Sequence, residues 1–294
     1  MITGASGFIG YAVVEELIRL GKYKVVAVIS GRREVTFPEN VKVEIANLLE
    51  EDQIKRVISD NKPDIICHFA WALEKKGFLD SDKNIEWLEA SISILKTFCE
   101  LGGKHFFFAG SSSEYGKGTR GNSEEEIGAE FTLYGTVKRA FEETMLCYCH
   151  NKGIIATAAR FFSVYGPRDD RGGSAIPTAI QDFMDGKKVI CKSPYNIWDY
   201  VYIDDAARAT VRLIDKSANG IFNIASGKPV MMFQVFNCIA QRMGCTDLLE
   251  MNHANNQSIS LLADTKKTES AIDYVCDTSL EAGISYTVDW WKNR

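Results

Sequence analysis

The sequence predicts a doubly wound α/β fold, in which helices cover both faces of a parallel sheet and a smaller α/β lobe is attached. Three observations support this prediction. Apolar runs alternate with helical stretches of about 15 residues through the first half of the chain, as they do in βαβ units. A glycine-rich turn opens the first unit. After Pro167 the elements become shorter and the alternation ends.

The glycine-rich turn is the first candidate site. Glycines at positions 4, 7 and 10 suit a tight turn that brings backbone N–H groups and a helix N-terminus close to a pyrophosphate. A lone glycine triplet is a weak signal, but a helical run through Leu20 and the strand 24–30 follow it, as the motif requires. The candidate cofactor-binding residues of this turn are Gly4, Ser6, Gly7, Phe8, Ile9 and Gly10.

The strand before this turn is unusually short. Only Met1, Ile2 and Thr3 precede the first glycine, whereas a typical strand has about five residues. We therefore expect a truncated or misassigned start.

The residues after the second strand predict the cofactor type. No acidic residue stands at the strand end, and Arg32 and Arg33 follow it. A carboxylate at this place binds the ribose 2′-hydroxyl of NAD(H), whereas an arginine accommodates the 2′-phosphate of NADP(H). The sequence therefore favours NADP(H) over NAD(H); a solvated basic turn is the alternative.

Further elements follow in order. We expect strands at 41–45, 65–70, 106–108, 153–162, 189–191 and 221–225. We expect helices at 84–101, 176–184 and 231–243, and one further helix that ends at Leu213. His68 lies within an apolar run, which favours a core histidine over a catalyst. Residues 117–133 form a polar loop that could cover the active site. We expect residues 1–165 and about 199–226 to form the dinucleotide-binding (Rossmann) domain, and residues 166–198 and 227–294 to form a substrate-binding lobe.

A serine, a tyrosine and a lysine are the candidate catalytic residues. Ser111 follows the buried strand 106–108, at the edge where open α/β sheets bind ligands. Tyr134 and Lys138 lie four residues apart at the start of a predicted helix, and so on one face of it. Tyr148 and Lys152 repeat this spacing about 21 Å further along, so only one pair can lie beside Ser111. We choose Tyr134 because it opens the helix.

Composition excludes several other functions. A net charge of -5 without a basic cluster argues against a nucleic-acid partner, and no apolar run approaches the ~20 residues that span a bilayer. The eight cysteines are scattered, as reduced core thiols are, which predicts a cytoplasmic protein. We expect no metal site, because Cys147 and Cys149 diverge by roughly 200° on a helix.

These motifs together resemble the extended short-chain dehydrogenase/reductases that act on nucleotide-activated sugars. The resemblance spans nearly the whole chain and includes the glycine triplet, the serine cluster before Tyr115-Gly116, the Tyr134/Lys138 pair and the segment from Arg160 to Pro167. It implies a nucleotide-diphosphate sugar as substrate and a homodimer. It also implies that Ser111 binds the reacting sugar oxygen, that Tyr134 is the general acid/base and that Lys138 binds the nicotinamide ribose.

The resemblance implies further contacts by position. Additional cofactor contacts fall on Asn47, Leu48, Phe69, Ala70, Trp71 and Phe161. Substrate contacts fall on Ser112, Ser163, Arg168 and Trp198. Trp198 stands where many members have an arginine for the substrate diphosphate, a role that Arg168 or Arg171 would then take. Ser112 and Ser113 stand where dehydratases have an acidic pair, which argues against water elimination.

Three functions remain. The first is an NADPH-dependent reductase of a 4-keto group on a nucleotide-linked 6-deoxy sugar, with Tyr134 as general acid. The second is a nucleotide-sugar 4-epimerase with bound NAD, because the same three residues serve both reactions. The third is a catalytically silent cofactor-binding sensor, although the chain keeps both the tyrosine and the lysine.

Overall fold

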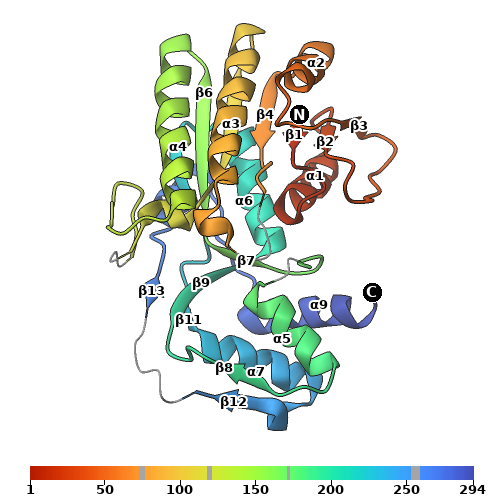
Figure 1. Cartoon of the computed structure of the whole chain (residues 1–294), viewed down its shortest axis with the longest axis vertical. Coiled ribbons are helices and arrows are strands. Elements are labelled where there is room, and N and C mark those ends of the chain that lie inside the picture. Colours follow the sequence, from red (N-terminus) through yellow and green to blue (C-terminus); the bar gives the residue numbers. More distant parts are fainter. Residues whose placement is uncertain (73–76, 118–120, 171–172, 253–258) are drawn as a thin grey trace.

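A seven-stranded parallel sheet forms the centre of the computed structural model, which describes residues 1–72, 77–117, 121–170, 173–252 and 259–294 (Figure 1). The strand order is β10-β6-β5-β4-β1-β2-β3, and every neighbouring pair is parallel. The predicted doubly wound fold is therefore confirmed. The strands are β1 Ile2–Thr3, β2 Val26–Ile29, β3 Lys42–Ile45, β4 Ile65–His68, β5 His105–Ser111, β6 Ile155–Phe161 and β10 Gly220–Ile224.

Helices bury both faces of this sheet. Helices α1 (Phe8–Leu20) and α6 (Ile203–Asp215) pack on one face, and α2 (Glu51–Asn61), α3 (Lys83–Glu100) and α4 (Leu133–Lys152) on the other. The side chains of β5 alternate between them, because Phe106 and Phe108 pack with α3 and α4 while Phe107 joins the opposite cluster. A strand buried on both faces has no polar side, which explains this continuous apolar run.

Strand β1 is short, as predicted, although it lies in the middle of the sheet. Ile2 pairs with Ala27 of β2 and Cys67 of β4. The α-amino group of Met1 is buried and donates a hydrogen bond to the carbonyl oxygen of Ile65 at 2.8 Å. The strand therefore reaches the glycine turn at its carboxyl end but does not extend along its neighbours at its amino end.

Smaller elements gather at one end of the molecule (Figure 1). Strand β9 pairs with β7, β11 and β13, and β8 pairs with β12. The predicted division into two lobes stays a prediction; of the predicted segment 199–226, β9 lies in the small sheet whereas β10 lies in the large one. These elements are β7 Ser163–Tyr165, α5 Ala175–Met184, β8 Val189–Cys191, β9 Ile197–Tyr202, β11 Pro229–Met231, α7 Met232–Met243, β12 Leu249–Met251 and β13 Ser260–Leu261.

The C-terminal segment contains two helices that were not predicted from the sequence, α8 (Lys266–Ile272) and α9 (Leu280–Lys292). In α9 the buried residues Ile284, Val288 and Trp291 follow helical spacing, and the side chain of Ser279 caps the first turn. Gly283 weakens this signal because glycine is a poor helix former. It is nevertheless required, since a Cβ there would lie 2.2 Å from the Tyr165 hydroxyl oxygen.

One hydrophobic cluster connects the large sheet to the smaller elements. It includes Ile2 in β1, Val13 in α1, Val201 in β9, Val235 in α7 and Val288 in α9. The two regions of the molecule therefore share a core. Among the helices of the described residues, none is both long and apolar enough to cross a membrane.

Candidate active site

The candidate site lies at the carboxyl ends of β1, β4 and β5. The glycine turn follows β1, the segment Phe69-Ala70-Trp71 follows β4, and Ser111 ends β5. Because these strands are parallel, their carboxyl ends meet at one edge of the sheet. The topology thus brings together residues that are about 40 to 100 positions apart in the chain.

The glycine turn is built for a close approach of the backbone. Gly4 has a φ of +67°, and a Cβ at this position would lie 2.7 Å from the amide nitrogen of Ala70. A Cβ at Gly10 would lie 2.4 Å from the carbonyl oxygen of Gly4. Helix α1 starts after Gly7, and glycine has no side chain that could cap the first turn. Backbone N–H groups in the first turn of a helix can bind an anion.

Ser111 is held in position by the turn that follows it. Its backbone N–H donates to Glu114 Oε1 at 2.6 Å, and its Oγ accepts a hydrogen bond from the N–H of Ser113 at 3.1 Å. These bonds form a capping box around the 3₁₀ helix η2 (Ser112–Tyr115). Because Oγ already accepts a bond, its own hydrogen is available for donation to a ligand oxygen.

The start of α4 packs directly against this serine turn. The side chain of Thr132 accepts a hydrogen bond from the N–H of Gly135 at 3.1 Å and so caps the helix. A Cβ at Gly135 would lie 2.3 Å from the carbonyl oxygen of Ser113. Glycine at this position therefore allows the contact that brings Tyr134, the second residue of α4, to the serine turn.

Lys138 lies one helical turn further and is buried beneath Tyr134. Its Nζ donates to the carbonyl oxygen of Ala109 at 2.8 Å and lies 4.0 Å from the ring centre of Trp71. Nζ is 5.9 Å from the ring centre of Tyr134. Burial lowers the pKa of Lys138 to about 7, although Glu114 opposes this shift. The lysine can therefore gain and lose its charge near neutral pH.

Tyr134 is only 7% exposed and contacts two aromatic rings edge-on, those of Trp71 and Phe78. Phe78 belongs to the 3₁₀ helix η1 (Phe78–Asp80). The second pair with the same spacing lies at the far end of α4, where Lys152 Nζ is 5.7 Å from the Tyr148 ring. The two pairs have similar internal geometry, but only Tyr134 lies beside the serine turn.

A buried charged network lies beneath Ser111. Arg160 of β6 donates to Glu142 of α4 at 2.5 and 3.1 Å and lies 3.5 Å from Glu114 Oε2. Burial raises the pKa of Glu114 well above its usual range, and the neighbouring Glu142 carboxylate reinforces the shift. Glu114 Oε2 has no donor among the described residues, which fits a protonated carboxyl that shares its hydrogen with Glu142.

The interpretation of His68 as a core histidine is confirmed. Its Nδ1 lies 2.7 Å from Thr3 Oγ1 and its Nε2 lies 2.9 Å from Ser91 Oγ. Burial lowers the pKa of His68 to about 3. The ring therefore stays neutral and links β1 and β4 to α3.

Most of the remaining predicted cofactor residues line the core next to the site. Phe69 contacts Phe161, and the Trp71 indole N–H donates to Asn84 Oδ1 at 2.9 Å. Leu48 is buried in the cluster beneath α2 and α3. Asn47 Oδ1 accepts from the backbone N–H of Leu49 at 3.3 Å, so this side chain stabilises its own turn.

The glycine turn borders a cavity of about 400 Å³ that is rich in arginine. Arg33 forms an ion pair there with Asp170, which follows β7, and the guanidinium of Arg168 lies 3.9 Å from the Tyr11 ring centre. Arg32 does not line this cavity. Asp170 was not among the predicted site residues, because nothing in the sequence connects residues 137 positions apart. The lining residues are Ser6, Gly7, Phe8, Tyr11, Arg33, Glu34, Val35, Thr36, Arg168, Asp170, Trp290 and Arg294.

The predicted substrate residues come from separate elements. Ser112 lies in η2, Ser163 opens β7, and Trp198 lies in β9. Ser163 and Tyr200 are paired in register, so β7 and β9 are adjacent. The indole nitrogen of Trp198 is buried and has no acceptor among the described residues. Arg171, the alternative to Arg168, lies outside the described residues.

These observations fit a dinucleotide cofactor. The Gly4 turn has no room for a side chain, the first turn of α1 is uncapped, and cationic side chains border the adjacent cavity. The fold and this site define a Rossmann-type, nicotinamide-dependent enzyme with a Ser-Tyr-Lys constellation. More narrowly, the chain belongs to the NAD dependent epimerase/dehydratase family, whose model matches residues 1–225.

Relatives of known type match the whole chain. It is 25% identical to the UDP-N-acetyl-alpha-D-glucosaminuronate decarboxylase of Bacillus cytotoxicus, over 99% of this chain and 97% of the relative. It is 24% identical to the UDP-glucuronate 4-epimerase of Thermodesulfobacterium geofontis, over 100% and 96%. The UDP-glucose 4-epimerase of Thermus thermophilus, solved in complex with NAD, has a TM-score of 0.89 at 22% identity, over 99% and 98%.

Proposed function

We propose that this protein is a nucleotide-sugar 4-epimerase that works with a bound NAD. The observation that supports the proposal most is the packing of the Ser111 turn against the start of α4, which brings a hydroxyl donor, a tyrosine and a buried lysine together. Similar whole-chain relatives include 4-epimerases of UDP-sugars. The substrate class is accordingly a UDP-hexose or UDP-hexuronate.

Each of the three residues has a distinct task in this reaction. Tyr134 accepts the proton of the sugar C4 hydroxyl, and Ser111 donates a hydrogen bond to the same oxygen. Lys138, when protonated, favours the tyrosinate and so makes Tyr134 available as a base. A bound nicotinamide, held by the glycine turn and Lys138, would supply the hydride acceptor for oxidation at C4 and the hydride donor for reduction of the 4-keto group from the opposite face. Tyr134 then returns its proton to the C4 oxygen, so no net redox change occurs.

The surroundings of Ser111 argue against water elimination, which is another reaction of the family. Elimination of water needs an acid and a base at neighbouring carbons of the sugar. Ser112 and Ser113 carry no charge, and the nearest carboxyl in the sequence, Glu114, is buried beneath the turn with its Oε1 bonded to Ser111. The same absence of an available carboxylate in this turn favours simple hydride exchange at C4.

The choice of NAD departs from the preference for NADP(H) that Arg32 and Arg33 suggested. Arg33 is paired with Asp170, whose carboxylate would repel a 2′-phosphate. The solved relatives with NAD in their names also favour this choice. We further propose that Arg168, next to the glycine turn, contacts the cofactor diphosphate instead of the substrate.

A 4-ketoreductase remains the second candidate, because the Arg32 side chain is exposed and no partner of its guanidinium is found among the described residues. One experiment separates the two. The purified protein is given UDP-glucose, UDP-N-acetylglucosamine or UDP-glucuronate without added cofactor, and the C4 epimers are followed by NMR. Mass spectrometry identifies the nucleotide that acid treatment releases.

Epimer formation together with released NAD supports the epimerase. NADPH oxidation with a 4-keto sugar, combined with no epimer from any of the three substrates, would favour the reductase instead.

The predicted homodimer is a separate proposal, in which α3 and α4, which pack side by side, form the interface (Figure 1). Sedimentation of the purified protein at twice the monomer mass would support it.

A further inference from the structure

Two cysteines from neighbouring helices lie together at the ends of α3 and α4 that point away from the candidate active site. Helices α3 and α4 lie side by side (Figure 1). Cys149 of α4 is fully buried in the hydrophobic cluster that both helices share, and Cys99 of α3 is half-buried and packs against the same cluster. Each thiol is within hydrogen-bonding reach of the other.

The register of the sheet explains why these two positions meet. Helix α3 leads into β5 and α4 leads into β6, and these parallel strands pair with His105 opposite Ile155. Cys99 lies six positions before His105, and Cys149 lies six positions before Ile155. Because both cysteines have the same offset from paired residues, they lie at the same level of adjacent helices. Their contact therefore follows from the topology of the fold.

The surroundings of the pair favour a thiolate on Cys99. The hydrogen bond from Cys149 lowers the pKa of Cys99, and the charge of Lys152 adds to this shift, although burial and Glu100 oppose it. The same hydrogen bond, together with burial, raises the pKa of Cys149. The accessible sulfur is therefore the better nucleophile, and the buried sulfur stays protonated next to it.

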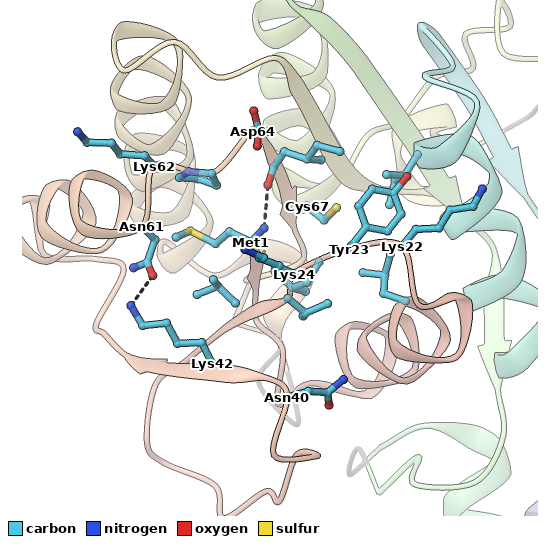
Figure 2. Close-up of a pocket in the computed structure, with 17 residues that line it drawn as sticks. Met1, Lys22, Tyr23, Lys24, Asn40, Lys42, Asn61, Lys62, Asp64 and Cys67 are labelled. Atoms are coloured by element: carbon cyan, nitrogen blue, oxygen red, sulfur yellow. Dashed lines mark hydrogen bonds between the residues drawn. The ribbon is translucent and has the colours of Figure 1, made fainter.

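Two other cysteines provide comparisons. Cys67 borders a cavity of about 650 Å³ at the amino ends of β1, β2 and β4 (Figure 2), where no second cysteine lines the cavity among the described residues. Burial raises the pKa of Cys67 to about 12. Cys147 is exposed, and its sulfur accepts a hydrogen bond from Asn151 at 3.9 Å. It is two positions from Cys149, so the two side chains diverge by roughly 200° around the helix.

We propose that Cys99 and Cys149 form a reversible redox pair, which a peroxide oxidises to a disulfide between α3 and α4. The Cys99 thiolate attacks one peroxide oxygen, the O–O bond breaks, and a sulfenic acid forms while the other oxygen takes the thiol proton and leaves as water. The Cys149 sulfur then attacks the Cys99 sulfur, the S–O bond breaks, and the hydroxide leaves with the Cys149 proton as a second water. The two sulfurs lose two electrons and the peroxide gains them. A dithiol reductant reverses the change.

The disulfide would lie far from the reacting groups of the candidate active site. Tyr134 precedes Cys149 on α4 by about 15 residues, or about 22 Å along the helix axis. The bond would close a loop of about 50 residues in the unfolded chain, so the oxidised protein should melt at least about 3 °C above the reduced protein. Neither the bond nor this shift depends on the proposed reaction.

The test treats the reduced full chain with hydrogen peroxide and then blocks the remaining thiols in denaturant. Mass spectrometry should show a loss of about 2 Da per chain, and a proteolytic digest should contain Cys99 linked to Cys149. Dithiothreitol should restore both thiols. Cys147→Ser is the matched control on the same helix, and it should form the link as the parent protein does.

Two further variants separate the roles of the two sulfurs. Cys149→Ala keeps a small apolar side chain at the buried position and removes the second sulfur. The sulfenic acid on Cys99 should then persist, and dimedone should trap it at least about tenfold more than in the parent protein. Cys99→Ser should show neither the link nor trapping at Cys149.

Three outcomes would overturn the proposal. The first is a peroxide-treated parent protein in which Cys99 and Cys149 remain free thiols. The second is a disulfide that involves Cys147 or joins two chains in place of the predicted link. The third is dimedone trapping at Cys149 in the Cys99→Ser protein, which would show that the buried sulfur reacts with peroxide by itself.

Discussion

Tyr134 and Tyr148 provide a matched comparison at the scale of single residues. Each lies four positions before a lysine on α4, and the two ring-to-ammonium distances are 5.9 and 5.7 Å. Only the first pair adjoins the serine turn. Tyr134→Phe should lower kcat at least about a hundredfold, the usual size of a lost general acid/base, while Tyr148→Phe should stay within about twofold. Steady-state kinetics on the two purified variants measures this, and equal losses would refute the assignment of Tyr134.

Lys138 should be a destabilising residue as well as a functional one. Its pKa is about 7 in the folded protein because of burial, whereas an unfolded lysine titrates near 10.4. Below pH 7 the fold must hold a buried charge, and between about pH 7 and 10 the unfolded chain binds the extra proton, so stability rises with pH. Lys138→Met should therefore raise the melting temperature at pH 6 more than at pH 9.5, while activity is lost.

Thermal melting at the two pH values tests this directly. A variant that is less stable than the parent at pH 6 would show instead that the hydrogen bond to Ala109 and the contact with Trp71 outweigh the cost of the charge. Lys152→Met is the control, since that lysine is exposed and should change neither melting temperature nor activity.

At the residue scale, the sequence located the candidate groups but not their surroundings. Helical spacing is sufficient to place Tyr134 and Lys138 on one face, because it is a local property of the chain. The ion pair between Arg33 and Asp170 is not local, and it weakens the reason for preferring NADP(H). The position of Arg33 after the second strand does not reveal its partner, because the fold brings Asp170 from another segment.

Helix α4 and strands β5 and β6 meet in the network beneath Ser111, and there the two glutamates should behave differently. Burial and the neighbouring Glu142 charge raise the pKa of Glu114 well above its usual range and so favour the neutral carboxyl, which Glu114→Gln replaces with a neutral group of the same shape. We expect a loss below about 1 kcal/mol. Glu142→Gln leaves Arg160 without its main counter-charge and should cost about 3–5 kcal/mol.

Urea unfolding of both variants measures these free energies. Equal losses would show that Glu114 is ionised in the folded protein. Activity gives a second readout, because Glu114 Oε1 also accepts the Ser111 N–H, and the amide oxygen of Gln can keep that bond. Glu114→Gln should therefore keep most of its activity.

The elements of the large sheet were predictable because each has an apolar run and a clear end. Strand β4 and helices α3 and α7 match their predicted ranges to within about two residues. Helices α8 and α9 were missed, since α8 has seven residues and α9 contains Gly283, which fits against Tyr165. A contact with a distant tyrosine leaves no mark on local periodicity.

For the whole molecule, the Arg33–Asp170 pair joins the loop after β2 to the loop after β7 and should influence cofactor choice. Asp170→Asn frees the Arg33 guanidinium to bind a 2′-phosphate. The ratio of the NADH to the NADPH dissociation constant should rise by about three- to tenfold, or roughly 1 kcal/mol. Fluorescence titration with both cofactors measures the ratio. If neither Asp170→Asn nor Arg33→Gln changed this ratio of dissociation constants, Arg33 would have no part in cofactor selection.

The shared hydrophobic cluster extends beyond the part of the chain that the family model matches. The family model ends at residue 225, but Val235 of α7 and Val288 of α9 belong to the same cluster as Val13 of α1. A fragment of residues 1–225 would expose the apolar surface that those later helices cover. The fragment should therefore aggregate, or give the circular dichroism spectrum of an unfolded chain. A soluble fragment that binds NAD would contradict this expectation. The segment beyond the family model is thus also part of what keeps residues 1–225 folded, so any change of function that arises there must come through substitutions that leave this common interior intact.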